Sequence, residues 1–359
     1  MSSRPLTGRG ALSNRPSRYH ATVPEPDLEF VARDQDEEVL PDRHPDTQVR
    51  IDPTRTIISR NQSPDVPFSQ SINPYRGCEH GCIYCFARPT HAYLDHSPGL
   101  DFETILYAKP NAAALLDAEL RRPGYKPEVI HLGSNTDPYQ PIEREHRITR
   151  SILEKALEFG HPVSVLTKSA MIERDVDVLA ALARRGLTRA LFSVTTFDRS
   201  LKRTLEPRAA SATARLRALK TLSDAGVPCG VMVAPVIPKV TDHEMESILE
   251  AARAAGAVRA NWILLRLPRE VLALFEEWLR AHRPLAAAHV MSLLTGARGG
   301  HANDPRFVHR MKGTGAYYEV LDQRFKTASR RLGFQQEAAA PLDLGQFAPP
   351  DRSGQLALW

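Results

Sequence analysis

Three of the four cysteines in this 359-residue chain lie within eight positions, at Cys78, Cys82 and Cys85. Thiolates this close in sequence can wrap one side of a metal centre, and Gly77 and Gly81 can supply the backbone angles that so short a loop needs. A closed zinc site or an electron-transfer cluster normally takes four protein ligands. Three cysteines therefore predict a cubane cluster with one iron left open to a small molecule.

Two further side chains could bind a metal, His80 and Cys229. A zinc knuckle would use the same three cysteines with His80 as the fourth ligand. The fourth cysteine, Cys229, lies far downstream in an apolar segment. We expect it to be a small buried side chain and not a ligand.

The spacing C-x3-C-x2-C, followed by the aromatic residue Phe86, resembles the signature of the radical S-adenosylmethionine (SAM) superfamily. The resemblance implies a 4Fe-4S cluster on the three cysteines, with SAM bound at the open iron and Phe86 beside it. It implies an enzyme that cleaves SAM to methionine and a 5'-deoxyadenosyl radical, and an electron donor such as flavodoxin or ferredoxin.

The elements that must position this loop alternate between strand and helix. Such alternation predicts an α/β fold with parallel strands joined by right-handed crossovers, and six repeats resemble the partial (β/α)6 TIM-like barrel of radical SAM enzymes. In such barrels the chemistry gathers where the strands end. The predicted strands are 69–73, 128–133, 162–167, 189–195, 228–235 and 260–267, and the predicted helices are 111–122, 145–159, 172–185, 212–225, 243–255 and 269–281.

Small and polar residues follow the second predicted strand, in a loop that most resembles spore photoproduct lyase and its photolyase-like bacterial relatives. Hydroxyls, carbonyls and a carboxylate can accept hydrogen bonds from an ammonium group. The resemblance assigns the loop to the methionine amino group of SAM, through Ser134, Asn135, Thr136 and Asp137. Spore photoproduct lyase also has a cysteine in this loop that returns a hydrogen atom to its substrate. Residues 134–136 contain no thiol, so reversal of thymine damage does not follow.

Later strand ends supply the remaining SAM contacts that the resemblance implies. Lys168 would pair with the SAM carboxylate, with a solvated lysine as the alternative. Ser193 and Glu206 would lie near the ribose, and the apolar residues Val233 and Ala234 would face the adenine, although core packing explains these two equally well. Arg266, at the end of the sixth strand, could meet a carboxylate or phosphate.

Four regions are predicted along the chain. Residues 1–67 are rich in Pro, Ser and charged residues, which favours an extended or disordered arm, and the segment 8–13 is interpreted as a solvated tail. Residues 68–290 form the barrel. Residues 291–334 form a basic extension packed on it, and residues 335–359 form a flexible tail.

The charge and composition of the chain indicate which kinds of binding partner it has. The formal net charge is +5, and residues 296–331 hold eight Lys or Arg residues but only three acidic ones. A basic segment suggests nucleic acid, while an ordinary solvated helix face is the alternative. The sequence has no run of eighteen apolar residues, no signal-peptide pattern and no disulfide framework, so we expect a cytoplasmic protein without a membrane partner.

The last residues of the tail resemble the short motif that inserts into the pocket of the bacterial DNA sliding clamp. The apolar and amide side chains of this motif would be Gln355, Leu356, Leu358 and Trp359. A tail that folds back on the barrel is the alternative.

The function expected from these patterns is that of a radical SAM enzyme, lyase-like, acting on nucleic acid in DNA repair. The alternatives are a radical SAM enzyme with a protein or small-molecule substrate, and a non-catalytic iron-sulfur accessory factor in repair. No P-loop or dinucleotide fingerprint is present.

Overall fold

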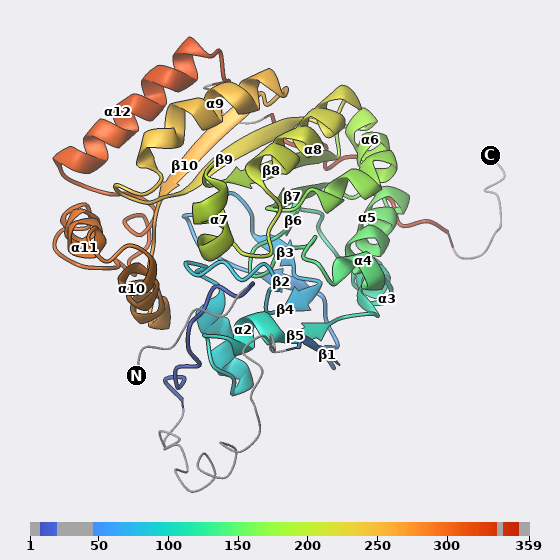
Figure 1. The fold of residues 1–359 in the computed structure, drawn as a ribbon. Coiled ribbons are helices and arrows are strands. Elements are labelled where there is room, and N and C mark those ends of the chain that lie inside the picture. The colour runs from blue at the N-terminus through green and yellow to red at the C-terminus, as the bar shows by residue number, and fades with distance from the viewer. Residues whose placement is uncertain (1–7, 20–45, 336–339, 352–359) are drawn as a thin grey trace, which may run out of the picture.

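The computed structural model describes residues 8–19, 46–335 and 340–351. Its centre is a curved sheet in which six parallel strands follow one another in sequence order (Figure 1). This confirms the predicted α/β partial barrel. A seventh strand, β2 (Ile58–Arg60), pairs antiparallel with the first barrel strand at one edge. The parallel strands are β3 (Gln70–Ile72), β6 (Ile130–Leu132), β7 (Val163–Thr167), β8 (Thr188–Val194), β9 (Cys229–Val236) and β10 (Arg259–Leu264).

Helices join the strands and cover the outside of the sheet (Figure 1). Their apolar residues recur at helical spacing; in α6, for example, Val178, Leu179 and Leu182 are buried. Three predicted helices are each split in the structure, into α4 and α5, into η3 and α6, and into η4 and α9. The outer elements are α3 (Ala112–Leu120), α4 (Glu143–His146), α5 (Ile148–Glu158), η3 (Met171–Asp175), α6 (Val176–Arg184), α7 (Arg199–Leu205), α8 (Ala212–Asp224), η4 (Asp242–Glu244), α9 (Met245–Ala254) and α10 (Glu270–His282).

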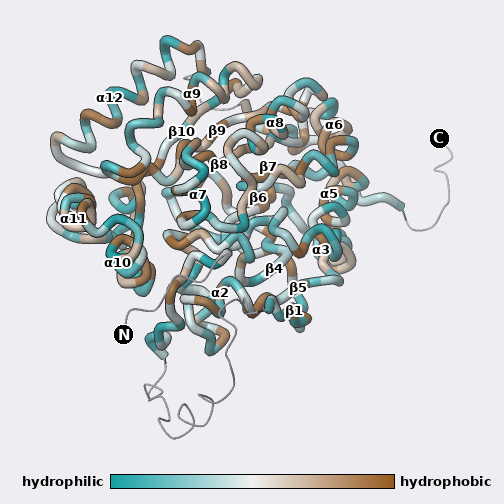
Figure 2. The backbone as a smooth tube through the Cα atoms, in the orientation of Figure 1, coloured by the Kyte–Doolittle hydropathy of each residue, from teal (hydrophilic) through white to brown (hydrophobic). Residues whose placement is uncertain are grey.

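The inner strands of the sheet are buried on both faces, whereas the edge strands β2 and β10 are partly exposed. Most residues of β7, β8 and β9 are inaccessible to solvent, and apolar colours dominate this region in Figure 2. Parallel strands covered on both sides are continuous apolar runs, which is why the sequence pattern located them well. Cys229, at the start of β9, is buried as predicted.

The described parts of the predicted N-terminal arm pack on the barrel. Strand β1 (Gln48–Ile51) pairs in parallel with β5 (Ile105–Ala108), which also pairs with β4 (Tyr75–Arg76) to form a small second sheet. Residues 8–13 are not a solvated tail, because Ala11 is 0% exposed and Arg9 only 4%. The interpretation of this segment as solvated was therefore wrong.

The predicted flexible tail also has an ordered part. Residues 340–351 lie along the ends of α5 and α6, where the ring of Phe347 packs 6.4 Å from that of Phe159 and 5.4 Å from that of Tyr125. The Ala348 amide donates to the carbonyl oxygen of Phe159 at 3.0 Å. Flexibility was thus wrong for these residues, and Gln355, Leu356, Leu358 and Trp359 lie outside the described residues.

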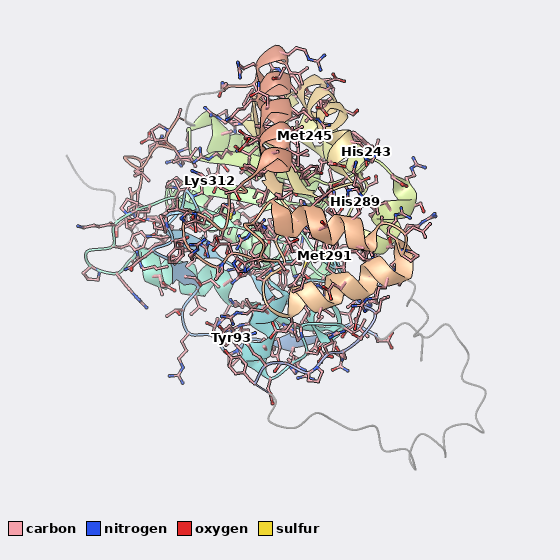
Figure 3. The ribbon with its side chains drawn as sticks, turned by 90° about the vertical axis from the view of Figure 1, so that its left-hand side faces the viewer. Tyr93, His243, Met245, His289, Met291 and Lys312 are labelled. Atoms are coloured by element: carbon pink, nitrogen blue, oxygen red, sulfur yellow. The ribbon has the colours of Figure 1, made fainter. Side chains whose placement is uncertain are left out.

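The predicted basic extension, residues 291–334, comprises the second part of α11 (Ala287–Gly296), a connection at 297–315 and α12 (Ala316–Arg331), and α12 packs on α9. Figure 3 views this face, with Lys312 labelled. Five of its eight cations form ion pairs with carboxylates, so much of the predicted positive charge is neutralised within the protein. The pairs are Arg306 with Asp304, Arg310 with Asp65, Arg324 with Glu246, Lys326 with Asp322 and Arg331 with Glu250.

None of the described helices is both long and apolar enough to cross a membrane.

Candidate active site

The three cysteines lie on the loop that follows β3 and β4. Cys78 and Cys82 are buried and Cys85 is partly buried. The Cys78 amide donates to the Phe102 carbonyl oxygen at 2.9 Å, and the Cys85 amide donates to that of Cys82 at 3.2 Å. Gly77 and Gly81 have φ of +76° and +68°, the left-handed conformation expected of them.

The donor set fits an iron-sulfur cluster better than it fits three free thiols. Burial raises the pKa of Cys78 well above its ordinary value, and the other two thiolates would raise it further. Burial and then the charge of Glu206 raise the pKa of Cys82 to about 12. Within the described ranges no three His, Cys, Asp or Glu side chains are already grouped to hold a metal ion. The three thiols, whose pKa values burial raises, would ionise on binding iron, because the charge of the metal offsets the cost of burial.

Arg88 and Glu103 hold the inner side of the cysteine loop. Arg88, in η2 (Arg88–Leu94), donates from Nε to the Cys82 carbonyl oxygen at 2.9 Å and from Nη2 to that of Gly81 at 3.2 Å. It also forms a fully buried ion pair with Glu103 in α2 (Asp101–Thr104), with 2.5 Å between Nη2 and Oε1. The carbonyl oxygens of the loop are therefore fixed by a cation that is itself neutralised.

Residues 8–13 cover the same loop from the other side. The amides of Gly10 and Ala11 donate to the two carboxylate oxygens of Glu103, at 3.0 and 2.9 Å. A Cβ at residue 10 would lie 1.8 Å from the Gly81 carbonyl oxygen, so only glycine permits this contact. The N-terminal segment thus braces the cysteine loop.

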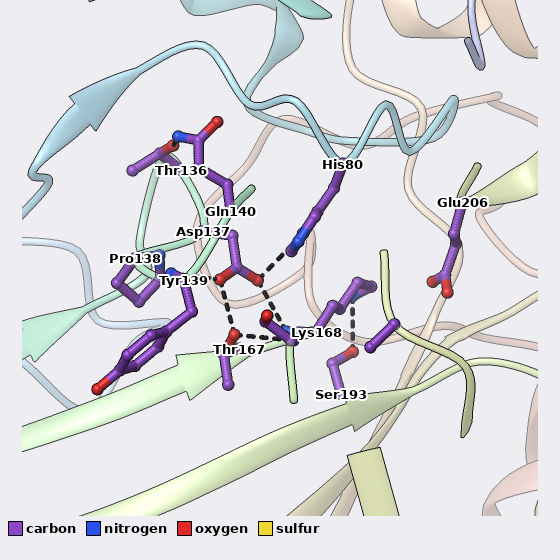
Figure 4. A network of polar contacts seen from close by, with 12 residues as sticks. His80, Thr136, Asp137, Pro138, Tyr139, Gln140, Thr167, Lys168, Ser193 and Glu206 are labelled. Atoms are coloured by element: carbon purple, nitrogen blue, oxygen red, sulfur yellow. Dashed lines mark hydrogen bonds and ion pairs between the residues drawn. The ribbon is translucent and has the colours of Figure 1, made fainter. Parts of the chain in front are cut away.

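Asp137 connects three loops at the ends of the strands (Figure 4). Its carboxylate accepts hydrogen bonds from the Thr167 hydroxyl and the Lys168 amide, both at 2.7 Å, and from the Tyr139 amide at 2.9 Å. His80 Nδ1 lies 3.4 Å from Oδ2. Burial by itself raises the pKa of Asp137, but the charge and hydrogen bond of His80, with the Thr167 and Lys168 donors, lower it to about 2.

Asp137 therefore positions the loops and does not present a free carboxylate. The ammonium-accepting role that the resemblance gave to this side chain disagrees with the four contacts that already use its oxygens. His80, the alternative zinc ligand, turns one ring nitrogen toward Asp137.

The neighbouring residues of that loop face the start of the cysteine loop. The Thr136 hydroxyl donates to the Gly77 carbonyl oxygen at 2.6 Å. The Ser134 hydroxyl and the Asn135 amide both donate to Asn73 Oδ1, at 3.1 and 2.8 Å. The structure thus brings the two predicted loops together through these hydrogen bonds.

Lys168 and Ser193 form a second polar group at the ends of β7 and β8. Lys168 Nζ donates to the Ser193 hydroxyl at 2.7 Å, and that hydroxyl donates to the Ala234 carbonyl oxygen at 2.9 Å. Among the described residues Lys168 has no ion pair with a carboxylate, and its Nζ lies 5.8 Å from the centre of the Tyr84 ring. A charged ammonium group beside the cysteine loop can bind the carboxylate of a ligand.

Glu206 is held by protein groups. It forms a buried ion pair with Arg215 in α8, accepts the Tyr84 hydroxyl, and lies 2.7 Å from the Thr195 hydroxyl. Burial alone raises the pKa of Glu206, but the charges of Arg215 and Lys168, and the Arg215 and Tyr84 hydrogen bonds, lower it to about 2. A direct contact of Glu206 with a ribose would have to share these oxygens.

The remaining predicted contacts differ in accessibility. Phe86 is 55% exposed, Val233 is 1% exposed within β9, and Ala234 is partly buried at the point where Ser193 and Thr195 reach its carbonyl oxygen. Phe86 and Ala234 are therefore open to a ligand, whereas Val233 packs in the core.

Sequence reasoning missed the charged residues that support the site, namely Arg88, Glu103 and Arg215. Arg215 occupies a buried position on α8 beside Ala218, Leu219 and Leu222. A charge on the apolar stripe of an amphipathic helix is the signal that could have identified it.

Comparison with known proteins agrees with this geometry. The model of the radical SAM superfamily matches residues 72–252, which is half of the chain. An uncharacterized protein of Mycobacterium tuberculosis (strain H37Rv) is 40% identical over 227 residues, covering 62% of this chain and 67% of that protein. A radical SAM Nalpha-GlyT isomerase of Pseudomonas phage M6 is 25% identical over 193 residues, covering 53% of this chain and 38% of that protein.

Among solved structures, a spore photoproduct lyase mutant with bound AdoMet and dinucleoside spore photoproduct has the same fold. The TM-score is 0.55 at 16% identity, over 79% of this chain and 78% of that one. The superfamily implies a 4Fe-4S cluster and SAM as cofactors. With its cysteine loop, its partial barrel and the family match over half of its length, this chain belongs to the radical SAM superfamily and is a radical SAM enzyme.

Proposed function

We propose that this enzyme uses Cys78, Cys82 and Cys85 to hold a 4Fe-4S cluster and acts on a nucleic acid, in the manner of a repair lyase. The observation that carries the substrate class is the fold that it shares with spore photoproduct lyase over most of both chains, in a structure that contains AdoMet and a dinucleoside lesion. When bound, the cluster supplies the electron that cleaves SAM.

The residues around the loop would orient SAM. Lys168, steadied by Ser193, would bind the carboxylate, while Ser134, Asn135 and Thr136 would present oxygens to the ammonium group. Phe86 and Ala234 would border the adenine. Asp137 and Glu206 would not contact SAM but would hold in place the loops that carry these groups, through their hydrogen bonds to Lys168 and Thr195.

A second reaction type is favoured by the absence of a thiol from residues 134–136 and by the name of the phage relative. An isomerisation conserves the atoms of its substrate, so it needs no external hydrogen donor. The two reaction types are distinguished after the product is digested to nucleosides: an isomerase would leave a nucleoside product of unchanged mass, whereas a repair lyase that divides a lesion would convert one dinucleoside lesion into two separate nucleosides.

The test is anaerobic reconstitution with iron and sulfide, followed by SAM and dithionite, with damaged and undamaged oligodeoxynucleotides. We expect 5'-deoxyadenosine, iron with labile sulfide, and deuterium exchange between SAM and nucleoside; Cys82→Ser should abolish all three. Zinc without sulfide would overturn the cluster. 5'-Deoxyadenosine formed without exchange into any nucleoside would move the substrate to a protein or small molecule.

Two partners are proposed on sequence grounds. A flavodoxin or ferredoxin would replace dithionite, and the sliding clamp would bind Gln355–Trp359. Titration of the clamp with a peptide of these residues should displace a known tail ligand, and Leu358→Ala in the peptide should weaken it. A peptide that displaces nothing would remove the clamp from the proposal.

A further inference from the structure

Three arginines meet beside the end of β10. Arg266 follows that strand, Arg298 follows α11, and Arg310 lies in the connection that leads to α12. Arg298 donates to the carbonyl oxygens of Leu264 and Leu265 at 3.2 and 2.8 Å, and to that of Arg310 at 3.3 Å. Arg298 thereby fixes the position of the connection against the strand end.

Arg310 has an acidic partner, and that partner is fully used. Its Nε lies 2.5 Å from Oδ2 of Asp65, and its Nη2 lies 2.5 Å from the hydroxyl of Ser63. Asp65 also accepts the Val308 amide at 2.6 Å, and its side chain is only 2% exposed. Asp65 comes from the segment between β2 and β3, so these contacts join segments next to the two edge strands of the sheet.

Arg266 has no such partner among the residues that the structure describes. Its Nη1 contacts the Met311 sulfur at 2.9 Å, which is a weak acceptor. Its Nε is enclosed without a hydrogen bond, and so is the Nε of Arg298. Arg266 is therefore a partly buried cation whose Nε is desolvated, without the anion that such a group normally accompanies.

The electrostatics of this place are unbalanced. Burial lowers the pKa of Arg266 to about 10, with further lowering by the charges of Arg310 and Arg298, while Asp65 opposes it. Of the three guanidinium groups only Arg310 contacts a carboxylate of the described residues, that of Asp65, and Asp304, whose charge acts on Arg298, is paired with Arg306 at 2.7 Å. Val308, a β-branched residue, is held at φ +69° in the same connection, a strained conformation that is commoner at functional sites.

We propose that Arg266, framed by Arg298 and Arg310, binds a phosphate group of the substrate, and that in a nucleic acid this group is a backbone phosphodiester. Guanidinium groups that approach from different elements suit a tetrahedral oxyanion, which accepts hydrogen bonds from several directions. The identification of the phosphate as a backbone phosphodiester rests on the proposed function, whereas phosphate binding itself does not.

The first test uses inorganic phosphate and the full chain. Phosphate should raise the midpoint of thermal unfolding relative to chloride at equal ionic strength, because a ligand that binds the folded state stabilises it. Arg266→Gln should weaken the apparent phosphate affinity about ten-fold or more, which is the loss of a charge-assisted hydrogen bond. Arg306→Gln is the matched control, since it removes the same charge from the same connection but from an exposed residue paired with Asp304.

The proposal would be overturned if phosphate and chloride gave the wild-type protein the same unfolding midpoint. It would also be overturned if Arg306→Gln lost as much phosphate affinity as Arg266→Gln. Arg266→Lys covers the case in which Arg266→Gln does not fold. It keeps the charge without the planar fork, so we expect weakened but measurable binding, and unchanged affinity would exclude a role for the fork.

The source of the phosphate is tested by competition. A short single-stranded oligodeoxynucleotide should displace inorganic phosphate, and its neutral methylphosphonate counterpart should not. If neither competes, the site takes free phosphate or a phosphorylated small molecule and the phosphodiester assignment fails. Release of 5'-deoxyadenosine, measured on the same samples, reports the radical reaction separately, so failure of the proposed function and failure of the phosphate site are distinguishable.

Discussion

Replacement of Gly10 by alanine tests whether residues 8–13 brace the cysteine loop. The new Cβ would lie 1.8 Å from the Gly81 carbonyl oxygen, while ordinary contact begins at 3.4 Å, so the two backbones must separate. Separation removes the amide hydrogen bonds of Gly10 and Ala11 to Glu103. Each hydrogen bond to a charged group contributes about 1.5–3 kcal/mol, so the docked state should lose about 3 kcal/mol or more.

The assay is alkylation of the metal-free protein by iodoacetamide, followed residue by residue with mass spectrometry. A loss of about 3 kcal/mol raises the open population about a hundred-fold, and the alkylation rate of buried Cys82 should rise with it. Cys229 is the internal reference, because it is 2% exposed in β9 and should not change. Gly296→Ala is the matched control, since a Cβ there meets nothing within 4 Å.

Two results would refute this reasoning. Alkylation of Cys82 in Gly10→Ala at the wild-type rate would mean that the segment does not hold the loop. An equal increase at Cys229 would mean that the substitution destabilises the whole barrel and not the brace.

Three further outcomes follow from the charged groups of the site. The pKa of Asp137, about 2 against an ordinary 3.8, adds stability that is present above about pH 4 and is lost as the pH falls toward 2. Asp137→Asn should therefore flatten the urea-unfolding free energy over this range, and an unchanged pH profile would contradict the assignment. Glu206→Gln leaves Arg215 buried without its carboxylate and should cost about 3–5 kcal/mol by the same assay, with a loss under 1 kcal/mol arguing against a buried pair. Lys168→Met should weaken SAM binding to the reconstituted enzyme about ten-fold or more in equilibrium dialysis, and equal affinity would remove Lys168 from the SAM site.

The barrel was predictable because its strands are apolar on both faces. Segments such as 162–167 and 228–235 are continuous apolar runs between amphipathic helices, and the structure has β7 and β9 there. The cysteine loop was identified by spacing alone, which needs no knowledge of distant contacts.

The support of the site was not predictable by the same means. The Glu103 carboxylate accepts a hydrogen bond from the Gly10 amide, 93 positions away in the sequence. Arg215 could be distinguished from a solvated arginine only from the packing of α8, which buries it. Composition also misled at both ends of the chain. Residues 8–13 lie in a region rich in Pro, Ser and charged residues, and residues 340–351 contain three prolines, yet both segments pack through backbone hydrogen bonds and a few apolar side chains. The composition of a segment gives its polarity, but its burial depends on the distant residues that pack against it in the fold.

The internal ion pairs of the basic extension bear on how salt would affect a nucleic-acid complex. Each phosphate neutralised by a free cation releases counterions, so eight free cations would give a log–log salt dependence of about −7. In residues 296–331, only Lys312 and Arg330 are exposed cations for which the structure describes no acidic partner, which gives about −2, or about −3 with Arg266 included. Any binding through this face would therefore weaken less steeply with rising salt than the binding of proteins that hold DNA by charge alone.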